Sequence, residues 1–430
     1  MIEQLPSLIP DHVLKQRWFA GDAADKVEVV DSDELRGEWP KLVWALTDID
    51  GALYQLVLGG RPLGEHAGFL QAHESGVFGE IDGAFWYDAT LDPELALVLL
   101  DVFSGGQETA DRVRPMGVEQ SNSSLVFDDR LIAKLFRRVH PGRNLDVEVT
   151  TALAEAGFAH VAEPVAAWER DGNDLAFVQQ FLAGGAEGWA LALTSLRDFF
   201  ASGEADPAEA GGDFAGEANR LGRVTAEMHV AMAQAFGSRK GDPGLWAGIM
   251  RAGLSVLDGE PEQRAAAERV IDRLAAVRDA GAAIRVHGDY HLGQTMRTDS
   301  GWYVLDFEGE PARPLEERRV PSSPMKDVTG MLRSIDYAAR SVLTERDRAE
   351  VEKLEPLATA WGLHNRDCFL AGYLATEGVE TLLPSNADAF ETVLGAFELE
   401  KAVYELGYEL AYRPTWADIP RSAISRLTSG

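Results

Sequence analysis

The sequence has 430 residues, which is enough for two or three domains and a large hydrophobic core. Apolar residues make up 46% of it, so a chain that is disordered throughout is excluded. The formal net charge of −30 repels nucleic acid and anionic membranes, and the single cysteine, Cys368, excludes internal disulfides and a cysteine zinc site. An anionic substrate such as ATP would therefore need a local basic pocket or a bound metal ion.

The N-terminal stretch MIEQLPSLIPDHVLKQRWFAG lacks the basic start and uninterrupted apolar run of a signal peptide. Nowhere does the sequence reach the roughly 18 consecutive apolar residues of a transmembrane helix. These features predict a cytoplasmic protein.

Residues 1–105 are predicted to form a small α+β module. A helix-like opening is followed by VEVVD, KLVWALTDI and ALYQLVLGG, which are rich in β-branched and aromatic residues and end at Gly, Asp or Pro. The run ALALVLLDVF at 95–104 is expected to close the module as a further strand. GGQETADRVRPMG then has the polar, Gly-containing character of a junction.

Residues 106–183 have a β–β–α–β pattern. SLVFDD, RLIAKLFRR and LAFVQQFL are typical of strands, and NLDVEVTTALAEAGF between them has apolar spacing close to that of a helix. Residues 184–430 are predicted to be mainly helical, with a flexible insertion at 201–216 and two strand-like pieces, AAIRVHGD and GWYVLDFEG.

Two acidic clusters lie at the C-terminal ends of these two strand-like pieces. Asp289 and Gln294 lie in VHGDYHLGQT, and Asp306 and Glu308 lie in LDFEG. Together they offer one carboxylate that could orient a hydroxyl and three oxygen-bearing side chains suited to Mg²⁺, the two functions that phosphoryl transfer needs. The alternative is a polar turn followed by an acidic hairpin. The presence of both clusters favours the site.

Two histidines, His287 and His291, flank Asp289 two residues away on either side, which could suggest metal ligation. A zinc site would need further His or Cys ligands at defined spacing, and none occurs nearby. We therefore expect both histidines to hold the loop through hydrogen bonds.

The strand–strand–helix region carries a second group of candidates. The polar loop QSNSS could cradle phosphate oxygens or could be a solvated hairpin tip. Lys134 interrupts the apolar strand LIAKLF and needs a partner, for which Glu148 on the next helix is available. A strand Lys paired with a helix Glu is the ATP-binding half of the kinase arrangement. FVQQFL at 177–182 could present backbone groups to adenine.

Several rival chemistries lack their motifs. The sequence contains no GxxxxGK[ST], GxSxG or HExxH and no Rossmann glycine pattern between a strand and a helix. A P-loop kinase, an α/β-hydrolase, a zincin and a dinucleotide-binding enzyme are therefore not supported.

HGDYHLGQ followed by LDFEGEP resembles the aminoglycoside-phosphotransferase-like kinases, which are relatives of the protein kinases and usually have Asn where this chain has Gln294. A closer resemblance is to actinobacterial maltokinases, which make maltose 1-phosphate from maltose and ATP. It rests on segments that span almost the whole chain: RWFAG, SNSS, KLFRRVHPGRNLDVEV, AGGDFAGEANRLG, HGDYHLGQTMRT, DFEGEPARPLEERRVPSSPMKDVTGMLRSIDYAA and FELEKAVYELGYELAYRPTWADIP.

The resemblance implies an α+β, bilobal protein-kinase-like fold. It comprises an N-terminal cap module (1–105), an ATP-binding N-lobe (106–183) and a mainly helical C-lobe with the catalytic loop and the sugar site (184–430). It also implies roles for individual residues. Asp289 would be the catalytic base; Gln294 and Asp306 would bind Mg²⁺, with Glu308 near the metal or sugar. The implied ATP contacts are Gln120, Ser121, Asn122, Ser123, Ser124, Lys134, Glu148, Gln180 and Leu182.

Candidate sugar contacts are His287 in the catalytic loop and Glu398, Lys401, Tyr404 and Glu405, which share or adjoin one helical face. That face could equally form ordinary salt bridges. The acceptor itself stays open between maltose and another sugar or aminosugar, such as glucosamine, glucose or an aminoglycoside, because a few placed hydrogen bonds decide it. Family analogy suggests trehalose synthase as a partner. A non-catalytic kinase-like scaffold is a further alternative, disfavoured because all of these motif residues are present together.

Overall fold

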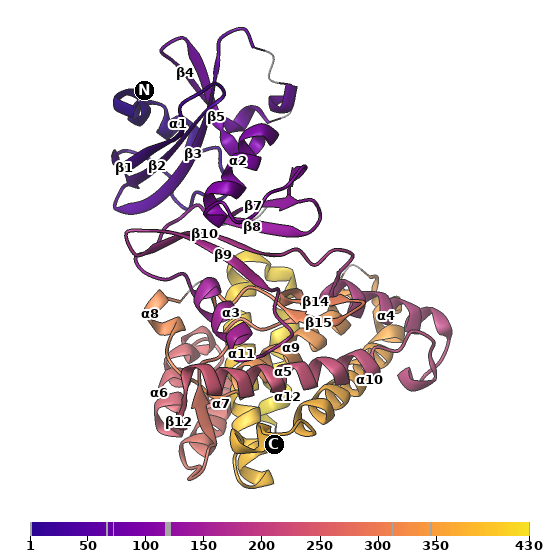
Figure 1. Ribbon diagram of the computed structural model, residues 1–430. Coiled ribbons are helices and arrows are strands. Elements are labelled where there is room, and N and C mark those ends of the chain that lie inside the picture. Colours follow the sequence, from indigo (N-terminus) through magenta and orange to yellow (C-terminus); the bar gives the residue numbers. More distant parts are fainter. Residues whose placement is uncertain are drawn as a thin grey trace. The chain divides into compact units, whose positions relative to one another are not determined.

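A computed structural model describes the chain except for Met1, residues 66–67, Ala72, residues 117–121, Ala312, Glu345 and Gly430. The chain divides into two compact units (Figure 1). The N-terminal unit comprises Met1–Thr151 and Ala162–Ala183, and the C-terminal unit comprises Ala152–Val161 and Gly184–Gly430. Most of both predicted N-terminal segments, 1–105 and 106–183, lies in the first unit.

The N-terminal unit begins with η1 (Ile2–Ser7) and α1 (Ile9–Val13), followed by a five-stranded antiparallel sheet in the order β1-β2-β3-β5-β4. Its strands are β1 (Val27–Arg36), β2 (Lys41–Ile49), β3 (Ala52–Pro62), β4 (Val77–Ile81) and β5 (Ala84–Asp88). Alternate residues of β2 enter different cores. Val43 and Ala45 pack with α1, whereas Leu42 and Trp44 join an apolar cluster shared with a second sheet. Burial on both faces explains why KLVWALTDI is almost continuously apolar.

The second sheet is also antiparallel and five-stranded, in the order β6-β7-β8-β10-β9. Its strands are β6 (Val113–Pro115), β7 (Asn122–Phe127), β8 (Leu131–Phe136), β9 (Pro164–Arg170) and β10 (Asn173–Gln180). The buried Gln55 of β3 joins the two sheets, because its Nε2 donates to the carbonyl oxygens of Phe136 and Leu175 at 2.6 and 2.5 Å. Helix α3 (Leu145–Glu155) follows β8, and the division between the units falls within it.

One predicted strand is wrong. Residues 95–104 form most of helix α2 (Pro93–Ser104), which packs against β9 and β10. The helix is specified at its ends: Asp92 accepts a hydrogen bond from the Glu94 backbone N–H, Pro93 occupies the first turn, and Gly105 ends the helix in the left-handed conformation. A continuous apolar run does not by itself separate a buried helix from a buried strand.

The C-terminal unit is mainly helical, which confirms the α+β prediction for this part of the chain. Its helices are α4 (Gly188–Ser202), α5 (Ala215–Phe236), α6 (Pro243–Gly253), α7 (Pro261–Ala275), α8 (Leu315–Arg318), α9 (Met325–Ser341), α10 (Arg348–Leu374), α11 (Ala387–Tyr412) and α12 (Asp418–Thr428). Small sheets are formed by β11 (Ala186–Glu187), β12 (Ser238–Lys240), β13 (Ala282–Ile284), β14 (Thr295–Thr298) and β15 (Gly301–Val304). The remaining short 3₁₀ segments of the chain are η2 (Gly68–Leu70), η3 (Glu74–Gly76), η4 (Ala89–Leu91), η5 (Pro207–Glu209), η6 (Leu254–Leu257), η7 (Leu292–Gln294), η8 (Val379–Thr381) and η9 (Pro414–Trp416).

Helices α5 and α10 run side by side in the C-terminal unit (Figure 1). Their close approach depends on two glycines, because a Cβ on Gly222 would collide with the Phe369 carbonyl and a Cβ on Gly372 would collide with the Asn219 carbonyl. Within the described residues, no helix is long and apolar enough to cross a membrane.

Candidate active site

The predicted catalytic loop lies between β13 and β14, with Gly288 at φ +88° just before Asp289. The Asp289 carboxylate is about one-quarter exposed. Its Oδ1 lies 3.7 Å from Lys401 Nζ and its Oδ2 lies 3.9 Å from His291 Nε2. These are ion-pair distances longer than hydrogen bonds, so both carboxylate oxygens keep lone pairs that can accept a hydroxyl proton. Burial lowers the pKa of His291 and disfavours its charged form.

Asp327, in the first turn of α9, holds the backbone of the catalytic loop through hydrogen bonds. Asp327 is fully buried and accepts hydrogen bonds from the backbone N–H groups of His287 and Gly288 at 2.7 and 2.9 Å. His229 of α5 approaches the same carboxylate at 3.2 Å, and its other ring nitrogen lies 2.9 Å from the Tyr373 hydroxyl. Burial alone would raise the pKa of Asp327, but the bond to His229 and the backbone N–H groups lower it, so the anchor is ionised.

His287 connects this loop to the second acidic cluster. Its Nε2 lies 2.9 Å from the Leu305 carbonyl, and its ring packs near Tyr290 and Phe307. The side chain is 2% exposed, which agrees with the expected loop-holding role. A sugar contact by His287 stays a prediction.

Gln294 and Asp306 are brought together as the sequence predicts for a metal site. Gln294 Nε2 donates to Asp306 Oδ2 at 3.1 Å, and the Leu305 N–H donates to the Gln294 carbonyl. Asp306 has a left-handed backbone, with φ +60°. The Glu308 carbonyl accepts a hydrogen bond from Arg318.

Magnesium fits this arrangement. The Gln294 amide oxygen and the Asp306 carboxylate are hard oxygen donors, and Mg²⁺ typically takes one or two carboxylates with substrate phosphates and water. No group of three or more His, Cys, Asp or Glu side chains with metal-binding geometry occurs in the described part of the chain. Most of the coordination sphere would therefore come from the nucleotide and solvent.

The nucleotide-side candidates lie in the N-terminal unit. Lys134 Nζ donates to Asp146 Oδ2 at 2.7 Å, and this partner from α3 is one that the sequence analysis did not name. Glu148 lies two residues further along the same helix and is half-buried, and its pairing with Lys134 stays a prediction.

The predicted phosphate loop falls partly outside the described residues, because Gln120 and Ser121 are among those not described. Asn122, Ser123 and Ser124 open β7. Ser123 Oγ accepts a 2.8 Å hydrogen bond from the buried Arg137, whose other guanidinium nitrogen donates to Asp88 of the first sheet at 2.5 Å. Gln180 ends β10 with an exposed side chain, and the half-buried Leu182 follows it.

One cavity of the C-terminal unit adjoins the catalytic loop, and it shares Arg313, Glu400 and Tyr404 with a second cavity. The first, which we call the recess, is nearly filled at about 20 Å³ and is lined by Gly288, Tyr290, Glu310, Arg313, Lys326, Thr329, Gly330, Phe397, Glu400, Lys401 and Tyr404. The second, which we call the tyrosine groove, has about 390 Å³. It is lined by Ile249, Met250, Gly253, Leu254, Val256, Ile271, Arg313, Leu399, Glu400, Val403, Tyr404, Gly407, Tyr408, Ala411 and Tyr412.

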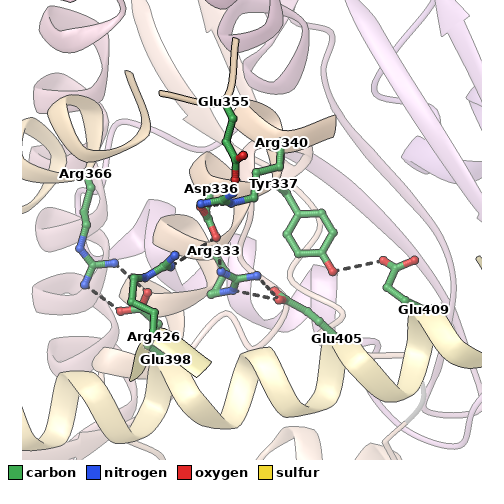
Figure 2. A network of polar contacts seen from close by, with 10 residues as sticks. All are labelled: Arg333, Asp336, Tyr337, Arg340, Glu355, Arg366, Glu398, Glu405, Glu409 and Arg426. Atoms are coloured by element: carbon green, nitrogen blue, oxygen red, sulfur yellow. Dashed lines mark hydrogen bonds and ion pairs between the residues drawn. The ribbon is translucent and has the colours of Figure 1, made fainter. Parts of the chain in front are cut away.

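Helix α11 separates the four predicted sugar residues that it carries. Lys401 and Tyr404 line the recess. Glu398 and Glu405 belong to a network of ion pairs on another side of the helix (Figure 2), where Arg366 holds Glu398 at 2.8 and 2.7 Å and the buried Arg333 holds Glu405 at 2.8 Å. Neither glutamate lines a cavity described above, and a sugar role for them stays a prediction.

Comparison with known proteins defines the class. Residues 112–310 match the family model described as "Phosphotransferase enzyme family". Together with the protein-kinase-like fold, this match supports the predicted aminoglycoside-phosphotransferase-like kinase superfamily. The protein is an ATP-dependent phosphotransferase that acts on a hydroxyl group, and enzymes of this class use ATP with Mg²⁺. The scaffold alternative is disfavoured accordingly.

The relatives are similar over most of their length. The chain is 29% identical over 360 residues to a glucosamine kinase of Streptacidiphilus jiangxiensis, covering 78% of this chain and 77% of that protein. It is 26% identical over 348 residues to a glucosamine kinase of Mycolicibacterium smegmatis (strain ATCC 700084 / mc(2)155), covering 76% of this chain and 82% of that protein.

Solved structures agree with the fold. A glucosamine kinase in crystal form B has a TM-score of 0.73 at 21% identity, covering 100% of this chain and 99% of that chain. A glucosamine kinase in complex with glucosamine, ADP and inorganic phosphate has a TM-score of 0.70 at 22% identity, covering 99% of this chain and 100% of that chain. The closer resemblance to maltokinases stays a prediction.

Proposed function

We propose that the protein is a sugar kinase that transfers the γ-phosphoryl group of ATP to the anomeric hydroxyl of maltose, giving maltose 1-phosphate and ADP. The observation that carries this choice is the tyrosine groove beside the recess. A monosaccharide held at Asp289 would leave this groove empty, whereas a disaccharide has a second ring that needs further space.

The size and lining of the groove suit a second hexose ring. Its volume of about 390 Å³ lies in the range of small-ligand sites. Tyr404, Tyr408 and Tyr412 follow one another at four-residue intervals on α11, so their rings share one face of the helix. Aromatic rings offer rigid apolar faces with a polar hydroxyl at one end, which suits a pyranose with one C–H face and hydroxyls around its rim.

The proposed chemistry assigns one task to each group. Asp289 orients the anomeric hydroxyl and accepts its proton as the new oxygen–phosphorus bond forms and the bond from the γ-phosphorus to the ADP oxygen breaks. Gln294 and Asp306 would hold Mg²⁺, which neutralises charge on the phosphates when bound. Lys134 would position the nucleotide phosphates, with Asp146 fixing its ammonium group.

Glucosamine is the second candidate acceptor. It is favoured by the names of the two relatives, which match more than three-quarters of the chain. Two carboxylates in the recess, those of Glu310 and Glu400, could also attract an amino group. Association with trehalose synthase stays a prediction from the maltokinase resemblance.

A coupled assay of ADP release across maltose, glucose, glucosamine and an aminoglycoside tests the proposal. Maltose should give the highest kcat/KM, and phosphorus NMR should place the phosphate on the anomeric carbon. If maltose gives no stimulation while another sugar does, maltose is the wrong acceptor.

A variant pair tests the role of the groove. Tyr408→Ala should raise the KM for maltose by about tenfold, the effect of losing one aromatic contact, and should leave the KM for glucose unchanged. Leu410→Ala is the matched control, because Leu410 is exposed on the same helix and does not line the groove. Equal effects of Tyr408→Ala on both sugars would show that the second ring does not bind there.

A further inference from the structure

Lys401 of α11 brings a positive charge to the proposed catalytic base. Its Nζ lies 3.7 Å from Asp289 Oδ1, and its side chain is 24% exposed, so a ligand can reach it. His291 approaches the other carboxylate oxygen at 3.9 Å, but burial lowers the pKa of that imidazole and disfavours its charged form. Within the described residues, Lys401 is therefore the charged partner of the base at neutral pH.

Two contacts fix the position of the Lys401 ammonium group. One is the ion pair with Asp289, and the other is a cation–π contact with Tyr404, one turn further along α11, whose ring centre lies 5.1 Å from Nζ. The distance to Asp289 is too long for a hydrogen bond. Neither contact therefore occupies any of the three N–H donors of the ammonium group.

The geometry of phosphoryl transfer brings the reacting atoms close to this ammonium group. A hydroxyl that donates to Asp289 lies about 2.7 Å from the carboxylate oxygen. The attacking oxygen then approaches the phosphorus to about 3–3.5 Å. Lys401 Nζ, 3.7 Å from Oδ1, is as close to the base as the reacting atoms must be, so an oxygen of the transferred group can come within hydrogen-bond distance of it.

We propose that Lys401 is a catalytic residue that donates a hydrogen bond to a nonbridging oxygen of the phosphoryl group while that group is transferred. This inference rests on the proposed function, because it takes Asp289 as the base for the acceptor hydroxyl. The acceptor oxygen bonds to phosphorus, its proton passes to Asp289, and the bond to the ADP oxygen breaks with its electron pair staying on ADP. Lys401 stays protonated throughout and transfers no proton.

The charges that change during this step favour such a role. Before transfer, the Asp289 carboxylate is the anion that Lys401 faces. Protonation of Asp289 removes that anion while a negatively charged phosphate ester forms beside it. The attraction between Lys401 and the reacting group therefore grows as the reaction proceeds, and interactions of this kind speed the chemical step. In a chain of net charge −30, the ammonium group also offsets the repulsion between Asp289 and the anionic phosphoryl group.

Replacement of Lys401 tests the inference, with the acceptor that the sugar panel identifies. Lys401→Met should lower kcat about 100- to 1000-fold, as expected for the loss of one preorganised donor to a developing charge, while the KM values for the acceptor and ATP change little. Lys401→Arg keeps the charge and should restore part of the rate. Lys401→Gln should show the same loss as Lys401→Met and replaces it if thermal unfolding shows that the Met variant does not fold. Lys353→Met, at an exposed position on α10, is the matched control for the loss of one positive charge.

An analogue of the transferring phosphoryl group separates direct contact from a structural role. ADP with aluminium fluoride and Mg²⁺ mimics that group when the acceptor is present. Lys401→Met should weaken inhibition by this mixture about 100-fold and leave inhibition by ADP alone unchanged. Equal weakening of both, or a kcat close to that of the unmodified enzyme, would overturn the inference.

The outcomes also separate the role of Lys401 from the choice of sugar. If the panel selects a sugar other than maltose and Lys401→Met still lowers kcat on it, the maltose assignment fails and the role of Lys401 stands. If maltose is the acceptor and Lys401→Met raises only the KM for maltose, Lys401 contacts the sugar instead of the phosphoryl group and the inference is wrong.

Discussion

Replacing Asp327 by Asn should slow phosphoryl transfer much more than it weakens substrate binding. The variant keeps one acceptor oxygen but puts an NH₂ group where the second carboxylate oxygen accepts a backbone N–H of the catalytic loop. The N–H groups of His287 and Gly288 bond to different oxygens of Asp327. One of these two residues therefore loses its hydrogen bond in the variant.

The size of the effect follows from these contacts. Losing a hydrogen bond to a charged group costs about 1.5–3 kcal/mol. The free energy of unfolding of a typical domain is larger, roughly 5–15 kcal/mol, so the variant should still fold. A displacement of the base by about 1 Å lowers the rate about 100-fold. We therefore expect kcat to fall about 100-fold while the KM values for ATP and sugar change little.

Single-turnover kinetics and thermal unfolding of the same samples provide the measurement. Asp336→Asn is the matched control: Asp336 lies on the same helix and pairs with Arg333 and Arg340, but has no bond to the loop. It should lower the melting temperature and leave kcat within about twofold, as expected for an independent site. If Asp327→Asn also leaves kcat within that margin, the loop does not depend on this anchor.

Three further predictions concern other parts of the chain. Burial lowers the pKa of His12 to about 4 from an ordinary 6.5, so the unfolded chain binds the proton more readily than the folded chain. The N-terminal unit should therefore lose up to about 3 kcal/mol of stability as the pH falls from 6.5 to 4. Urea unfolding of His12→Phe should not show this pH dependence. Lys134→Met should lower kcat/KM for ATP about 10- to 100-fold without changing the affinity for sugar, as measured by isothermal titration; an unchanged ATP dependence would exclude Lys134 from the nucleotide site. Arg333→Met leaves Glu405 and Asp336 without their buried partner and should destabilise the fold by about 3–5 kcal/mol in urea unfolding, whereas an unchanged midpoint would show that the network in Figure 2 contributes little.

Parts of the site could be predicted because their chemistry leaves a local mark in the sequence. Lys134 stands out as a charge within an apolar strand, and Gln294 and Asp306 follow short motifs in which oxygen-bearing side chains gather. The three tyrosines of α11 also have a visible spacing, so the groove they line could have been inferred from FELEKAVYELGYELAY.

Other features depend on contacts between distant segments and leave no such mark. Asp327 looks like any acidic residue in the first turn of a helix, a common position because of the helix dipole. Only the fold shows that it reaches the backbone forty residues earlier and meets His229 from α5.

The two sides of α11 have a consequence for how this enzyme could change its substrate. Glu398 and Glu405 hold the helix through arginines on α10 and α9, while Tyr404 and Tyr408 contribute to the cavities from another side. Mutations of the tyrosines would therefore leave the ion pairs that orient the helix intact. New acceptor preferences could arise by exchanging a few cavity residues, in natural divergence or in a selection experiment, without loss of the folded enzyme.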